Sequence, residues 1–141
     1  MRALPAAYDL SGRVALVTGA GSPDGIGFAT ARLLGELGAR VAVTATTDRV
    51  DERVSDLVDD GVEAVGLVAD LTEPALVLGV LEEVRARLGA PTVLVANAGM
   101  TSLASPGSSG RAVDVSYDEW RASIARNLDT AFLVTRAALP G

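Results

Sequence analysis

The stretch of sequence that decides the fold runs from Val14 to Gly27 and reads VALVTGAGSPDGIG. Its first four residues form a continuous apolar run, which is typical of a parallel strand covered on both faces. Glycines follow at once, and a helical pattern begins at Ile26. Such a turn lets backbone amides approach a phosphate closely, and the helix N-terminus adds partial positive charge. The stretch therefore predicts a dinucleotide-binding site, with a tight packing turn as the alternative.

The same alternation of strand and helix continues along the chain. Further apolar runs at residues 41–44, 64–68 and 93–96 predict three more buried strands. Glycines at 38, 61 and 89 close the first three helical patterns, and Thr72 is the expected N-cap of the third, ahead of Pro74. The apolar positions at helical spacing are Ile26, Leu33, Leu34 and Leu37, then Val50, Val54, Leu57 and Val58, then Val77, Val80, Leu81, Val84 and Leu88, and finally Trp120, Ile124, Leu128 and Phe132.

This order of elements predicts the fold class. Strand, helix and strand in repetition favour parallel pairing through right-handed crossovers. We expect an α/β protein, a doubly wound (Rossmann) parallel sheet with helices on both faces, formed by one domain over residues 1–141.

The composition excludes several kinds of chemistry. All 12 basic residues are Arg, and the chain of 141 residues contains no Lys, His or Cys. A thiolate nucleophile, an imidazole base, a Schiff base, a Walker A lysine and a His or Cys metal site are therefore excluded, and no metal is expected. The net charge of -6 argues against nucleic-acid binding, and no apolar run reaches the ~18 residues of a membrane span. We expect a soluble cytoplasmic protein.

The end of the second strand bears on the choice of dinucleotide. It reads TATTDR, from Thr44 to Arg49. A free 2′-hydroxyl group calls for a carboxylate near this position, whereas a 2′-phosphate calls for hydroxyl groups or Arg. Thr46, Thr47 and Arg49 therefore favour NADP. NAD is the alternative, through Asp48, although Asp48 is equally interpreted as the N-cap of the next helix.

Two further motifs stand where a nucleotide-binding crevice needs them: Asp70 follows the third strand, and Asn97-Ala98-Gly99 follows the fourth. Asn127 lies in the last helical pattern, which reads Arg126-Asn127-Leu128 there. Together with the glycine motif, they resemble the short-chain dehydrogenase/reductase family over residues 10–140, most of all its 3-oxoacyl reductase-type members. The resemblance implies an oxidoreductase that transfers hydride between NADP(H) and a small-molecule carbonyl or secondary alcohol.

The resemblance also implies a role for each matching residue. Asp70 would bind the adenine amino group, with the backbone of Leu71 nearby, while Asn97 would brace the central strands. The backbone carbonyl of Asn127, the one candidate catalytic residue, would hold a water molecule of the proton relay. The candidate cofactor-binding residues are Thr18, Gly19, Gly21, Ser22, Gly25, Ile26, Gly27, Thr46, Thr47, Asp70, Leu71, Asn97, Ala98 and Gly99.

The chain departs from the family pattern in two ways. Five residues separate Gly19 from Gly25, where the family usually has three, which resembles the longer loop of its enoyl reductase branch. The catalytic Ser, Tyr and Lys of the family follow the helix that bears Asn127, and this chain stops at Gly141. Tyr117 with Arg121 imitates the Tyr and Lys spacing, but both precede Asn127, so we interpret Tyr117 as structural.

We therefore expect the cofactor-binding half of such an enzyme, ending after the fourth strand and its following helix. It should be inactive alone and form a homo-oligomer when full length. A complete, non-catalytic dinucleotide-binding or regulatory module is the alternative.

Three surface expectations remain. Residues 101–110 are either a lid over the ligand or a surface connection. The last helical pattern resembles the helix that forms the dimer interface of the family, with core cover as the alternative. Residues 93–95 should lie at an apolar edge of the sheet that invites pairing or aggregation.

Overall fold

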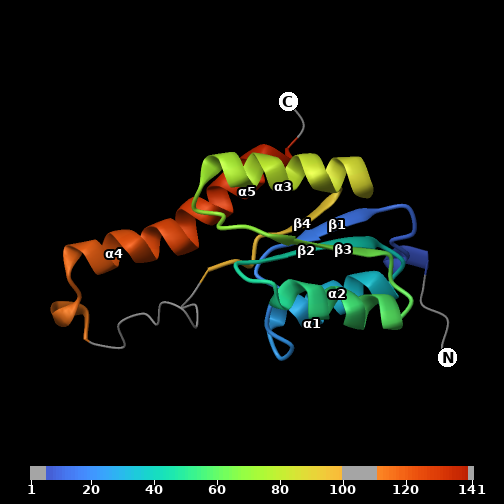
Figure 1. Cartoon of the computed structure of the whole chain (residues 1–141), viewed down its shortest axis with the longest axis horizontal. Helices are drawn as coiled ribbons and strands as arrows, with labels where there is room; N and C mark the ends of the chain where they lie inside the picture. Colours follow the sequence, from blue (N-terminus) through green and yellow to red (C-terminus); the bar gives the residue numbers. More distant parts are fainter. Residues whose placement is uncertain (1–5, 100–110, 140–141) are drawn as a thin grey trace.

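The computed structural model describes residues 6–99 and 111–139 (Figure 1). Four parallel strands form one sheet in the order β3-β2-β1-β4, so the predicted doubly wound fold is confirmed. The strands are β1 (Val14–Val17), β2 (Arg40–Ala45), β3 (Ala64–Val68) and β4 (Val93–Val95). The helical elements are η1 (Ala6–Tyr8), α1 (Ile26–Glu36), α2 (Arg49–Asp59), α3 (Pro74–Arg87), η2 (Ala112–Asp114), α4 (Tyr117–Ile124), η3 (Ala125–Asp129) and α5 (Thr130–Ala138).

Helices cover both faces of the sheet, and β1 shows why its sequence is apolar throughout. Ala15 and Val17 are buried in the core that α1 and α2 cover, whereas Val14 and Leu16 are buried in the core that α3 and α5 cover. Figure 1 shows these two helical layers on opposite sides of the strands, with α4 extending away from the sheet. Because successive side chains of a strand point to opposite faces, a strand covered on both sides needs apolar residues at every position.

The buried face of α1 differs from the prediction. Ile26 and Leu33 are 78% and 55% exposed, and the residues that face the sheet are Gly27, Phe28 and Ala31. Of the predicted stripe, Leu34 packs against the core, whereas Ile26 and Leu33 do not. Gly27, next to the buried Phe28, is small because the helix begins close to the glycine turn, which leaves no room for a side chain there.

The last predicted helix is also different. It is divided into α4, the π-helical turn η3 and α5. Trp120, Leu128 and Phe132 are each more than half exposed, so the interpretation of this stripe as core cover is wrong for them. A π-helical turn carries its hydrogen bonds from i to i+5, so the spacing of 3.6 residues that the prediction used does not continue through η3.

Two helix starts show how local hydrogen bonds set element boundaries. The N-cap of α3 is Glu73 and not the predicted Thr72, whose backbone N–H and hydroxyl both donate to Asp70 Oδ1. Ser116 and Glu119 form a capping box at the start of α4. The backbone N–H of Ser116 donates to the Glu119 carboxylate, which lowers the pKa of that carboxyl group below its usual value.

Thr18 joins the end of β1 to the chain that leaves β4. Its hydroxyl oxygen accepts hydrogen bonds from the backbone N–H groups of Asn97, at 3.0 Å, and Ala98, at 2.9 Å. Its own N–H donates to the Val95 carbonyl at 3.0 Å. Since Thr18 is only 1% exposed, water does not replace these bonds, and the side chain fixes how the two strand ends sit together.

Two sequence expectations concern residues 101–110 and the possibility of a membrane span. Residues 101–110, expected as a lid or a surface connection, lie outside the described part of the chain. Within residues 6–99 and 111–139, no helix combines the length and the apolar character that crossing a membrane requires.

We predict that Thr18→Val lowers the free energy of unfolding by about 1 to 3 kcal/mol, because it removes the acceptor of the part-buried Ala98 N–H and one of the two acceptors of the Asn97 N–H. Thr18→Ser is the matched control. It keeps the hydroxyl oxygen and loses one methyl group, worth about 0.8 kcal/mol. Urea denaturation followed by circular dichroism measures both variants, and equal losses would contradict the role of the hydroxyl group.

We also predict that the 141-residue chain associates through β4. Among the described strands, β4 pairs with β1 alone, so its other edge offers unpaired backbone groups along an apolar run. Sedimentation velocity over a range of concentrations should show self-association. Thr92→Lys, at an exposed position directly before the strand, should weaken it. A monomer at every concentration would refute the prediction.

Candidate functional site

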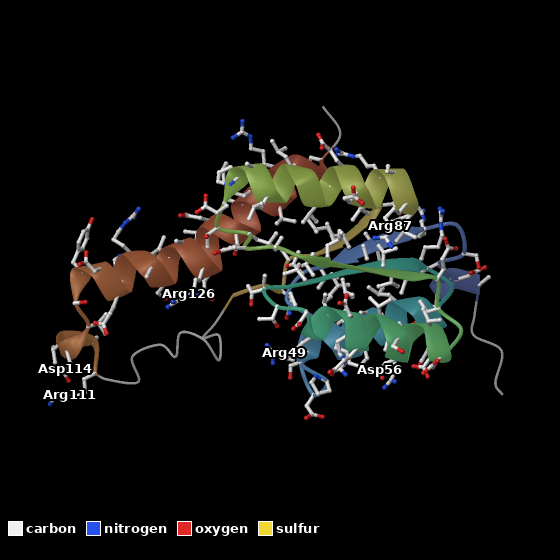
Figure 2. The ribbon with its side chains drawn as sticks, viewed as in Figure 1. Arg49, Asp56, Arg87, Arg111, Asp114 and Arg126 are labelled. Carbon is white, nitrogen blue, oxygen red and sulfur yellow. The ribbon has the colours of Figure 1, made fainter. Side chains whose placement is uncertain are left out.

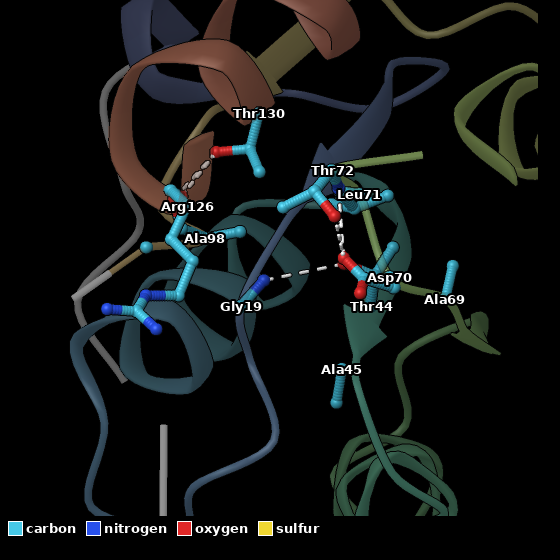
Figure 3. A pocket seen from close by; sticks show the side chains of 11 residues that line it. Gly19, Thr44, Ala45, Ala69, Asp70, Leu71, Thr72, Ala98, Arg126 and Thr130 are labelled. Atoms are coloured by element: carbon cyan, nitrogen blue, oxygen red, sulfur yellow. Dashed lines mark hydrogen bonds between the residues drawn. The ribbon is translucent and has the colours of Figure 1, made fainter. Parts of the chain in front are cut away.

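A hollow lies at the carboxyl ends of the strands, on the side of the sheet where the order of connection reverses between β1 and β4. In open α/β sheets, ligands bind at this switch point. Figure 3 shows the side chains around the hollow. The lining residues come from all four strand ends and from η3 and α5, and they are Gly19, Thr44, Ala45, Ala69, Asp70, Leu71, Thr72, Ala98, Gly99, Arg126 and Thr130.

The glycine turn is pressed against the chain after β4. Gly19 has a φ of +71°, and a Cβ atom built on it would lie 2.7 Å from the Cα of Ala98. A Cβ atom on Gly27 would lie 2.6 Å from the side-chain nitrogen of Asn97. Any larger residue at either position would separate the two segments, so the glycines are required here by lack of space.

Asn97 uses its side chain to hold this contact. Its Nδ2 donates to the backbone carbonyls of Thr18 and Gly19, both at 3.1 Å. The main chain of the glycine turn is therefore held from two sides, by the Thr18 hydroxyl and by the Asn97 amide. The position agrees with the bracing role that the sequence led us to expect for Asn97.

The start of α1 lacks a side-chain cap. Gly25 is the N-cap and has no side chain to accept a hydrogen bond from the first turn. Ser22 and Ile26, both predicted cofactor contacts, are exposed here, and the Ser22 carbonyl accepts a hydrogen bond from the Gly25 N–H. The first N–H groups of a helix have no partner within the helix, so this end can bind an anion.

The end of β2 lies beside the glycine turn. Arg49 Nε donates to the hydroxyl of Thr47 at 3.1 Å, and an Arg49 terminal nitrogen lies 3.9 Å from where a Cβ atom of Gly21 would be. Thr46 and Thr47 are exposed and do not line the hollow itself. Asp48 occupies the N-cap position of α2, as one interpretation predicted, but its side chain makes no capping hydrogen bond.

The end of β3 and η3 also contribute to the hollow. Asp70 is exposed and is held by Thr72, while Leu71 beside it is buried. Asn127 does not line the hollow. Its side-chain oxygen instead lies 2.7 Å from the position of a Cβ atom on Gly99, and its Nδ2 donates to the Ser123 carbonyl. Tyr117 is 75% exposed at the start of α4 and also lies outside the hollow.

Sequence reasoning missed several residues of the hollow, of which Arg126 and Thr130 matter most. The Thr130 hydroxyl donates to the Arg126 carbonyl at 2.7 Å, and the Ala98 carbonyl lies 3.5 Å from its oxygen. The family resemblance gave a role to Asn127 but no signal for which of its neighbours face the hollow. The π-helical turn at residues Ala125–Asp129 contributes to that orientation.

Comparisons with known proteins agree with this arrangement. The chain is 39% identical over 133 residues to the 3-oxoacyl-[acyl-carrier-protein] reductase FabG of Pseudomonas aeruginosa, covering 94% of this chain and 51% of that protein. It is 35% identical over 131 residues to FabG of Escherichia coli, with 93% and 50% covered. The chain therefore spans about half the length of the curated relatives that it matches.

Solved structures give the same result. A gluconate 5-dehydrogenase from Burkholderia cenocepacia, in complex with NADP and tartrate, superposes with a TM-score of 0.80 at 33% identity, covering 93% of this chain and 49% of that one. An actinorhodin polyketide ketoreductase with NADPH has a TM-score of 0.81 at 35% identity, with 90% and 46% covered. The family model described as short chain dehydrogenase matches residues 13–141. Because that match includes nearly the whole sequence, the chain belongs to the short chain dehydrogenase family.

Proposed function

We propose that this chain forms the cofactor-binding part of an oxidoreductase that uses NADP(H) to interconvert a small-molecule ketone and a secondary alcohol, most similar to the 3-oxoacyl reductases. The observation that carries the proposal is the glycine turn at the switch point, where Gly19 and Gly27 leave no room for a side chain. It brings the bare backbone of Gly19 to the hollow and leads into the N-terminus of α1, whose N-cap Gly25 has no side chain. The names of the related FabG proteins support the class of substrate.

The residues fit a dinucleotide along the carboxyl edge of the sheet. The turn from Gly19 through Gly21, Ser22 and Gly25 to Ile26 and Gly27 would hold the diphosphate through backbone N–H groups. Asp70 and Leu71 would receive the adenine ring, and Ala98 and Gly99 would lie against the ribose. Thr18 and Asn97 would keep the turn in place through the hydrogen bonds described above. When bound, the nicotinamide would supply or accept the hydride.

The proton chemistry falls to other groups. Asn127 would contribute its backbone carbonyl, which we propose holds a water molecule of the proton relay. The only phenols in the chain are those of Tyr8 and Tyr117, and no Lys is present to lower the pKa of a tyrosine. We therefore propose that this chain alone positions the cofactor and does not complete the reaction.

The preference for NADP rests on the end of β2. Arg49 and Thr47 form a hydrogen-bonded pair of a cation and a hydroxyl group beside the glycine turn. These are groups that bind a 2′-phosphate. Two neighbouring structures contain NADP or NADPH, which supports the same preference.

A homo-oligomer of the full-length enzyme is part of the proposal. Trp120, Leu128 and Phe132 are each exposed on α4, η3 and α5. Exposed apolar side chains of this size, gathered along one helical segment, are typical of a surface that a partner covers.

We predict that Arg49→Gln weakens the binding of NADPH by about tenfold and leaves NADH binding within twofold, because it removes a charge-assisted hydrogen bond to the 2′-phosphate. NMR titration of the chain measures both affinities, including weak ones. Arg87→Gln, at the opposite end of α3 from the hollow, is the control and should change neither (Figure 2). An equal loss for both dinucleotides would refute the assignment of Arg49.

We further predict that the 141-residue chain does not reduce a 3-oxoacyl thioester with NADPH. The loss of NADPH absorbance is measured against full-length FabG of Pseudomonas aeruginosa as the positive control. Sustained reduction by a sample whose intact mass equals that of this chain would overturn the proposal that the proton-donating residues lie elsewhere.

A further inference from the structure

Arg126 is the residue of the hollow that neither the sequence motifs nor the proposed roles account for. It comes from η3, the π-helical turn, and it is half-buried. Among the described residues that line the hollow, it alone carries a positive charge. Turns of this kind occur frequently at functional sites, because the wider turn changes which side chains face a ligand.

The main chain of Arg126 is held in place. The hydroxyl of Thr130, itself only 5% exposed, donates to the Arg126 carbonyl at 2.7 Å, and the Ala98 carbonyl lies 3.5 Å from the same hydroxyl oxygen. Thr130 therefore holds the main chain of Arg126 beside the segment that leaves β4. The Arg126 side chain therefore starts from a fixed point beside the hollow.

The side chain extends toward the glycine turn. In Figure 3, it runs past Ala98, and its guanidinium group ends on the side of Gly19 and away from Asp70. Both Gly19 and Ala98 line the same hollow as Arg126. In this view, the cation ends nearer to Gly19, the residue of the glycine turn that lines the hollow, than to Asp70.

The negative charge of the protein opposes the binding of a diphosphate, and a nearby cation would offset it. The net charge is -6, and Asp70 adds a carboxylate to the hollow itself. Apart from Arg126, the positive charge near a diphosphate bound there would come from the partial charge at the start of α1 and from Arg49 beside Gly21. A guanidinium group offers several N–H donors in one plane, a geometry that matches two phosphate oxygens at once.

We propose that Arg126 binds the diphosphate of the dinucleotide, as a side-chain cation that acts together with the backbone of the glycine turn. This inference rests on the proposed function, since it assigns a further contact in the same site. It differs from the role of Arg49, which concerns the 2′-phosphate at the end of β2.

The experiment compares wild-type chain, Arg126→Gln, Arg126→Lys and the control Arg121→Gln in NMR titrations with NADPH, NADH and adenosine. Arg121 lies in α4 and outside the hollow. We expect Arg126→Gln to lower the affinity for NADPH and for NADH by the same factor, about tenfold, and the affinity for adenosine by less than twofold. Arg126→Lys should recover part of the loss, because it keeps the charge without the planar donors. Raising the salt concentration should lower the dinucleotide affinity of the wild type more than that of Arg126→Gln.

Other outcomes overturn the inference and identify the error. An equal loss for adenosine would mean that the guanidinium stacks on the adenine ring, and a loss for NADPH alone would assign it to the 2′-phosphate. Unchanged binding by Arg126→Gln would remove Arg126 from the site while leaving the proposed function intact. Absence of dinucleotide binding by the wild type would instead refute the proposed function. Thermal melts check that each variant folds. If Arg126→Gln unfolds, Arg126→Lys is compared with the wild type instead. The inference then requires that Arg126→Lys binds adenosine as the wild type does and binds both dinucleotides more weakly.

Discussion

The close approach of the glycine turn to the chain after β4 is the contact on which the rest of the site depends. Gly19 meets Ala98, and Gly27 meets Asn97, at distances that exclude a Cβ atom. The Thr18 hydroxyl and the Asn97 amide then fix the two segments with hydrogen bonds. Because β1 and β4 are neighbours in the sheet but are separated along the chain by β2, β3 and three helices, this contact joins parts of the chain that are 80 residues apart, such as Thr18 and Ala98. It determines the width of the hollow between them.

The sequence allowed the framework to be predicted because its signals are local or strictly periodic. Each of the four strands is a short apolar run, and the residues that close it are glycines or polar groups. Asp70 and Asn97 could be placed near the hollow for a topological reason, since the carboxyl ends of parallel strands meet at one edge of the sheet. The glycine turn was predictable for the same reason, together with the start of α1.

Features that depend on packing between elements could not be predicted in this way. The face of α1 toward the sheet carries Gly27 and Ala31, which have almost no hydrophobic signal, while Ile26 and Leu33 gave a strong signal and lie outside. The π-helical turn changed the orientation of every residue after Ile124, which is why Arg126 was missed and Phe132 was misplaced. Thr72 was expected to cap α3, but the nearby carboxylate of Asp70 bound it instead.

The small residues on the inner face of α1 have a consequence for how this protein can vary. At Gly27, a substitution can only add volume, so the tolerated changes are almost none. On the outer face, Ile26 and Leu33 meet solvent and can be exchanged for polar residues with little structural effect, whereas Phe28 is buried and must stay apolar. Sequence divergence in this helix should therefore include two aliphatic positions that an amphipathic pattern assigns to the core. Homologues with polar residues at both positions would still be able to keep the same fold.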